Sequence, residues 1–166
     1  MADEGAEDYF THIRQGSYDM HRDNGPKCGE GCSLSPDLRG TYSVNIFSDE
    51  AVGRIQQHAN TSDPWFIYLA YQSIHEPLQA PAEYAERYGE TPGWGNWSQG
   101  QKTISMMLAC LDDGIKNVTG ALVSTAQVES TLIVLSTDNG GTGASSNYPL
   151  RGGKHSIYEG VPLPAW

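Results

Sequence analysis

Apolar residues recur along this chain with two different patterns, and each pattern predicts a different kind of element. The more regular one is helical and spans roughly residues 101–123. Its apolar positions recur in alternating steps of four and three residues, which places them on one helix face: Ile104, Leu108, Leu111, Ile115, Val118 and Leu122. A shorter helix is predicted from Ser48, a favourable N-cap residue, to about His58.

Two further segments are apolar almost without interruption, as is typical of strands covered on both faces. Residues 65–71 read Trp-Phe-Ile-Tyr-Leu-Ala-Tyr, and residues 131–136 read Thr-Leu-Ile-Val-Leu-Ser. The order helix, strand, helix, strand predicts an α/β fold with a mainly parallel sheet flanked by helices. Residues 1–40 are polar and rich in turn signals, so we expect a loop-rich segment there.

Polar side chains follow both predicted strands. His75 lies in Gln-Ser-Ile-His-Glu-Pro after the first strand, and Asp138 and Asn139 lie in Thr-Asp-Asn-Gly-Gly after the second. Because parallel strands end at the same edge of a sheet, these side chains can converge there. A carboxylate and an amide oxygen suit calcium or magnesium, although Asp-Asn-Gly-Gly is also ordinary turn chemistry.

Charge adds one more candidate. Lys154 follows two glycines in a chain whose formal net charge is −10, so its ammonium group can hold an anion as a compact positive charge. The plainer interpretations are a solvated lysine at 154 and, at His75, a histidine satisfied by the backbone. The acidic balance argues against nucleic-acid binding, which needs clustered Lys and Arg.

Cysteines, sequons and hydropathy bear on the compartment. Cys28 and Cys32 are close enough for a local disulfide or half of a zinc site, but no further ligands follow at zinc-site spacing, and Cys110 falls on an apolar helix stripe. No apolar stretch is long enough to span a membrane, and residues 1–8 lack a signal-peptide layout. Three asparagines begin Asn-x-Ser/Thr glycosylation sequons, which hint at an exported protein: Asn60, Asn96 and Asn117.

Four blocks of the sequence, taken together and in order, resemble the sulfatase family, most closely its arylsulfatase B (N-acetylgalactosamine-4-sulfatase) type. They read Tyr-Ser-Val-Asn-Ile-Phe from position 42, Gln-Ser-Ile-His-Glu-Pro-Leu-Gln-Ala-Pro-Ala-Glu-Tyr from 72, Ser-Thr-Asp-Asn-Gly-Gly from 136 and Pro-Leu-Arg-Gly-Gly-Lys from 149. The resemblance predicts a partial sulfatase catalytic domain at residues 41–160, after the loop-rich segment 1–40 and before a divergent tail at 161–166.

The resemblance implies an alkaline-phosphatase-like α/β fold and calcium-dependent hydrolysis of aryl or glycosaminoglycan-type sulfate esters. By position, Asp138 and Asn139 match two of the family's calcium ligands. His75 matches the histidine that contacts the sulfate and helps the alcohol to depart, and Lys154 matches the lysine that binds the sulfate. The implied ligand is a sulfated small molecule or glycan, and the implied location is lysosomal or secreted.

The chain also departs from the family pattern. The family nucleophile is a formylglycine made from the cysteine of Cys-x-Pro-x-Arg, and no cysteine here has a proline two residues on. The early aspartate pair of the calcium shell has no counterpart here, and His155 stands where a tryptophan is usual. We therefore expect the upstream part of the same domain in a longer parent, and no turnover by this chain alone. The alternative is a non-catalytic sulfatase-like protein that binds sulfated glycan.

Overall fold

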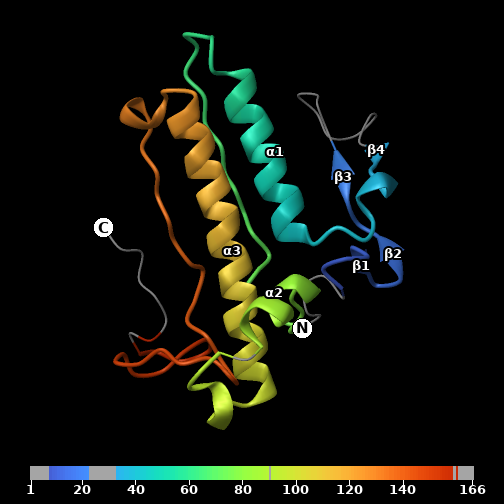
Figure 1. Cartoon of the computed structure of the whole chain (residues 1–166), viewed down its shortest axis with the longest axis vertical. Coiled ribbons are helices and arrows are strands. Elements are labelled where there is room, and N and C mark those ends of the chain that lie inside the picture. The colour runs from blue at the N-terminus through green and yellow to red at the C-terminus, as the bar shows by residue number, and fades with distance from the viewer. Residues whose placement is uncertain (1–7, 23–32, 90, 159, 161–166) are drawn as a thin grey trace.

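The computed structural model describes residues 8–22, 33–89, 91–158 and 160 (Figure 1). Its longest elements are two helices, α1 (Ser43–Gln57) and α3 (Gln99–Ser124), which pack against each other. A shorter helix, α2 (Ala82–Tyr88), packs on α3. Three single 3-10 turns complete the helical elements of the described part: η1 (Pro36–Leu38), η2 (Trp94–Asn96) and η3 (Val128–Ser130).

Short strands occur in the segment that was expected to be loop-rich. β1 (Ile13–Arg14) pairs antiparallel with β2 (Ser17–Tyr18), and β3 (His21–Arg22) pairs antiparallel with β4 (Ser33–Leu34). Each strand has two residues, so these pairs brace loops and form no layer of the fold. The predicted limits of the segments 1–40, 41–160 and 161–166 stay predictions, and the tail lies outside the described residues.

The predicted parallel sheet does not form within the described part of the chain. Residues 65–71 and 131–136 run alongside α3 as unpaired segments, both in the direction opposite to α1 and α3 (Figure 1). Their common direction is the one that a parallel sheet requires. A strand, however, needs a neighbour that pairs with its backbone N–H and C=O groups, and neither segment has one among the described residues.

The core lies between α1 and α3, and Gly114 allows their close approach. A side chain at Gly114 would meet the Ser48 hydroxyl oxygen at 2.5 Å and Val44 at 3.1 Å. The Ser48 hydroxyl is 2.8 Å from the Tyr71 hydroxyl, which attaches the end of segment 65–71 to α1. The buried apolar residues of these two helices are Val44, Ile46, Ala51, Ile55, Met106, Met107, Cys110, Ala121 and Leu122.

The long predicted helix is confirmed as α3. It begins with a capping box, in which Ser98 accepts a hydrogen bond from the backbone N–H of Gln101 and the Gln101 side chain accepts one from the backbone N–H of Ser98. The predicted apolar stripe is less buried than expected: Leu108 is 53% exposed, and Met107 and Cys110 fill the contact with α1 instead.

The predicted start of the first helix is wrong, because α1 begins at Ser43 and Ser48 lies inside it. Ser48 caps nothing, since its hydroxyl is buried against Tyr71. Cys110 is a free, buried core residue, as predicted, whereas Cys28 and Cys32 lie outside the described residues. No described helix is long and apolar enough to cross a membrane.

Candidate functional site

The loops that contain Asp138, Asn139 and Lys154 are joined by a backbone hydrogen bond. The N–H of Lys154 donates to the carbonyl oxygen of Gly140 at 3.1 Å. The same oxygen accepts a hydrogen bond from the side-chain amide of Asn139, also at 3.1 Å. Lys154 therefore lies beside the turn that contains the two candidate metal ligands.

Asn147, which sequence reasoning did not single out, holds these two loops together. Its side-chain oxygen accepts from the backbone N–H of Gly141 at 3.0 Å. Its side-chain nitrogen donates to the carbonyl oxygens of Gly141 at 3.1 Å and Gly152 at 2.9 Å. One amide thus bridges the Asp-Asn-Gly-Gly turn and the loop that leads to Lys154. The surrounding Ser-Ser-Asn-Tyr-Pro sequence contains no pattern that would have revealed this role.

The glycines of the turn allow the chain to fold back on itself. A side chain at Gly140 would overlap the carbonyl oxygen of Gly160, and one at Gly153 would overlap that of Gly141. A glycine lets another group approach the backbone closely. In the structure, the group that approaches them is another part of the backbone, and the loops pack into one compact unit at the base of α3 (Figure 1).

Charged groups of these loops remain available to a ligand. Asp138 is exposed and Lys154 is partly buried. Lys154 forms no ion pair with any residue that the structure describes. Within the described ranges there is no group of three or more His, Cys, Asp or Glu side chains that could hold a metal ion. Asp138 and the amide oxygen of Asn139 by themselves would supply only two of the six to eight oxygens that a calcium ion takes.

His75 lies in the segment that follows residues 65–71. Its Nδ1 is 2.8 Å from the carbonyl oxygen of Glu76. A carbonyl can only accept, so Nδ1 carries the proton in the neutral ring and Nε2 keeps its lone pair. The plainer interpretation, a histidine satisfied by the backbone, therefore holds for Nδ1 and leaves Nε2 for chemistry.

The His75 segment and the Asp138 turn approach the same end of α3 without a described hydrogen bond between them. Gly100, in the first turn of α3, marks this end: a side chain there would meet Ala144 at 3.1 Å and Leu78 at 3.5 Å. Leu78 follows His75, and Ala144 follows the Asp138 turn. The structure thus joins the backbone of Lys154 to the Asp138 turn, and at Gly100 it brings together Leu78 and Ala144 rather than His75 and Asp138 themselves.

Cys110 does not fit the role of the family nucleophile. It is 1% exposed in the core between α1 and α3, and its thiol lies 3.7 Å from the side-chain oxygen of Asn45. Burial raises the pKa of this thiol to about 11, so the thiolate is disfavoured near neutral pH. A reacting group needs access to substrate, which this position does not give.

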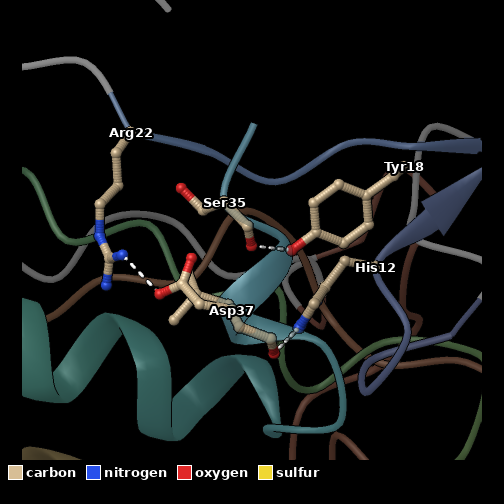
Figure 2. Close-up of polar contacts among 6 residues, drawn as sticks. His12, Tyr18, Arg22, Ser35 and Asp37 are labelled. Atoms are coloured by element: carbon tan, nitrogen blue, oxygen red, sulfur yellow. Dashed lines mark hydrogen bonds and ion pairs between the residues drawn. The ribbon is translucent and has the colours of Figure 1, made fainter. Parts of the chain in front are cut away.

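The N-terminal hairpins carry a second polar cluster, shown in Figure 2. The Nε2 of buried His12 lies 3.0 Å from the carbonyl oxygen of Thr41 and 3.3 Å from that of Leu38. Arg22 pairs with Asp37 at 2.9 Å, and the Tyr18 hydroxyl donates to the carbonyl of Ser35. These contacts fasten the strands to η1, so they explain the local fold.

The sulfatase family model matches residues 2–161 of this chain. The chain belongs to the sulfatase family. It is 36% identical to Arylsulfatase J of Mus musculus over 162 residues, which cover 94% of this chain and 25% of that protein. It is 27% identical to the uncharacterized sulfatase YdeN of Escherichia coli (strain K12), over 75% of this chain and 23% of that one.

A solved structure agrees with this assignment. The crystal structure of Ps i-CgsB in complex with k-i-k-neocarrahexaose is similar to 74% of this chain and 27% of its own, with a TM-score of 0.66 and 34% sequence identity. The predicted family and its alkaline-phosphatase-like α/β fold are thereby confirmed. The sulfatase chain spans about a quarter of the length of these relatives.

Proposed function

We propose that this sulfatase chain forms part of an active site that hydrolyses sulfate esters, with Lys154 and His75 at the sulfate and Asp138 and Asn139 at a calcium ion. The observation that carries the proposal is the hydrogen bond from the backbone N–H of Lys154 to the carbonyl oxygen of Gly140, which holds the backbone of Lys154 beside the Asp138 turn. The family assignment supports the reaction class.

The roles follow from the chemistry of each group. The Lys154 ammonium offsets negative charge on a bound sulfuryl group. Nε2 of His75, once protonated, donates to the alcohol oxygen as the ester bond breaks. A calcium ion, when bound, supplies positive charge at the sulfate oxygens. The Asn139 amide nitrogen is engaged with Gly140, so its oxygen would face the ion together with the Asp138 carboxylate.

The remaining parts of this active site are proposed to come from elsewhere in a sulfatase domain. No cysteine among the described residues is suitable for conversion to formylglycine. Two oxygens also cannot complete the shell of a calcium ion, which takes six to eight. The unpaired segments 65–71 and 131–136 support a partner of this kind, because exposed apolar strands are stabilised by pairing with neighbours. The proposed partner is the upstream part of the same domain.

The substrate class and the location are also proposals. The resemblance to the arylsulfatase B type and the similarity to Arylsulfatase J favour an aryl sulfate or a sulfated glycan. The saccharide in the similar Ps i-CgsB structure supports the glycan. The three sequon asparagines are all exposed, as glycosylation of a lysosomal or secreted protein would require.

An NMR titration of the 15N-labelled chain with sodium sulfate tests the sulfate site. We expect amide shifts at Lys154 and Gly140 that are lost in Lys154→Ala and kept in Lys116→Ala, a control on exposed α3 surface. Shifts that survive Lys154→Ala would remove Lys154 from the site. An assay of the chain alone with an aryl sulfate adds the second arm: turnover would contradict the proposal that the nucleophile lies elsewhere.

Calorimetry with calcium tests the metal proposal. The isolated chain should bind calcium weakly, because Asp138 and Asn139 provide two of the six to eight oxygens that the ion prefers. Micromolar binding that is lost in Asp138→Ala would show a complete shell and contradict this account. Sulfate binding without turnover, even with the rest of a sulfatase domain present, would favour the alternative of a non-catalytic glycan-binding protein.

A further inference from the structure

The geometry points to Tyr9 as a positioning residue that sets the orientation and the tautomer of His75. The functional meaning of this inference rests on the proposed role of His75. The contacts between Tyr9 and the His75 segment are observed whether or not His75 has that role. Tyr9 lies in the N-terminal segment, 1% exposed, and belongs to the core cluster with Tyr42 and Met107. No motif assigns it a function.

The Tyr9 hydroxyl reaches the carbonyl groups of two successive residues, His75 and Glu76. It lies 2.8 Å from the carbonyl oxygen of His75 and 3.1 Å from that of Glu76. The hydroxyl has a single proton, which these two carbonyls share. The Glu76 carbonyl also accepts the hydrogen bond from Nδ1 of His75 at 2.8 Å. Tyr9 therefore fixes the Glu76 carbonyl, which in turn accepts the hydrogen bond from the imidazole of His75.

Tyr9 is itself fixed at several points. Its backbone N–H donates to the side-chain oxygen of Gln79 at 3.1 Å, and its carbonyl accepts from the N–H of Ser43 at 3.1 Å. Its ring lies edge-on to Tyr42 with centroids 5.8 Å apart, and the Tyr42 hydroxyl donates to the Gln79 carbonyl at 2.8 Å. The segment from His75 to Gln79 is thus clamped at both ends by buried tyrosines.

This arrangement has a chemical consequence for His75. The hydrogen bond made by one ring nitrogen decides which nitrogen carries the proton in the neutral imidazole. With the Glu76 carbonyl held in place, Nδ1 keeps the proton and Nε2 is the nitrogen that can take or deliver one. Without the Tyr9 hydroxyl, the carbonyl can turn away, and the ring no longer has a preferred tautomer.

The test is to record the tautomer of His75 in the chain by long-range 1H–15N correlation of its ring nitrogens. We expect the Nδ1–H form to dominate in the wild type and the Nε2–H fraction to rise several-fold in Tyr9→Phe, which keeps the buried ring. The matched control is Tyr84→Phe, because Tyr84 is also buried and its hydroxyl bonds Asp113 at 2.9 Å. A folded Tyr9→Phe chain with the wild-type tautomer, or an equal shift in Tyr84→Phe, would overturn the inference.

A second measurement covers the case in which Tyr9→Phe does not fold. The exchange rate of the Tyr9 hydroxyl proton is measured in the wild type, through the isotope shift on the ring carbon that bears the oxygen. Slow exchange supports the bridging hydrogen bond, and exchange as fast as that of Tyr68, which is 83% exposed, would overturn it. The sulfate titration at Lys154 stays separate. Its failure with a normal tautomer shift would refute the proposed function and leave the role of Tyr9 intact.

Discussion

Residues 65–71 and 131–136 resemble each other in sequence, but the structure buries them differently. In the first segment exposure alternates: Trp65 packs against the cluster where α1 and α3 end, whereas Phe66 is 86% exposed. The second segment is exposed along most of its length, with Leu132 88% exposed. An apolar run therefore indicates that the segment becomes buried, but it does not show which other part of a protein buries it.

The largest expected difference between the two segments is in the unfolding free energy that is lost when an apolar side chain is truncated to alanine. Trp65→Ala removes apolar packing against Ile55 and the hydrogen bond from its indole N–H to Gln127 at 3.0 Å, so it should cost about 2–3 kcal/mol of unfolding free energy. Leu132→Ala should change it by less than about 0.5 kcal/mol. Urea unfolding followed by circular dichroism measures both. Equal losses would mean that the second segment is buried in solution.

A smaller difference is expected between two serines. Ser48→Ala leaves the Tyr71 hydroxyl without the partner that attaches segment 65–71 to α1, and it should cost about 1 kcal/mol. Ser136, at the end of the second segment, is exposed and donates only to the carbonyl of the next residue, so Ser136→Ala serves as the control. Urea midpoints that fall by the same amount in both variants would contradict the difference in anchoring.

The smallest effect concerns alkaline pH. Burial raises the pKa of Tyr71 above its ordinary value, although the Ser48 hydrogen bond opposes the shift. The Tyr71 hydroxyl loses its proton at a lower pH in the unfolded chain, near pH 10, than in the folded chain. Its contribution to the unfolding free energy is therefore complete below about pH 10 and declines as the pH rises toward the pKa of the folded state. Tyr71→Phe should therefore flatten the loss of stability above pH 10 in a series of urea titrations. An unchanged slope would show that this hydroxyl is not buried.

Local signals predicted the helices best. The predicted start of α3 lies within two residues of the observed one because the apolar period that indicates this helix lies in one stretch of sequence. The start of α1 was misplaced because Ser48 is a good cap in isolation, and its contact with Tyr71 depends on how the chain folds. The direction of segments 65–71 and 131–136 followed from the order of elements. Their pairing did not, because pairing needs a neighbouring strand and none of the described residues supplies one.

As with the helices, the local features of the candidate site were predictable and its long-range contacts were not. The proximity of Lys154 to the Asp138 turn could be inferred because both lie in short, glycine-rich loops close together in the sequence. The contact of Tyr9 with His75 could not, because 66 residues separate them and nothing about an isolated tyrosine indicates the carbonyl that its hydroxyl will reach. Sequence patterns identify residue types that suit a reaction, and the supports of those residues come from long-range packing.

Asn147 has a consequence for how the energetics of this region should be read. Because a single carboxamide braces the turn of Asp138 and the loop of Lys154, changes in either loop strain the same three hydrogen bonds. The energetic effects of substitutions on the two sides should then fail to add, as expected for residues that share a network. The Asp138 turn and the Lys154 loop would then behave as one thermodynamic unit.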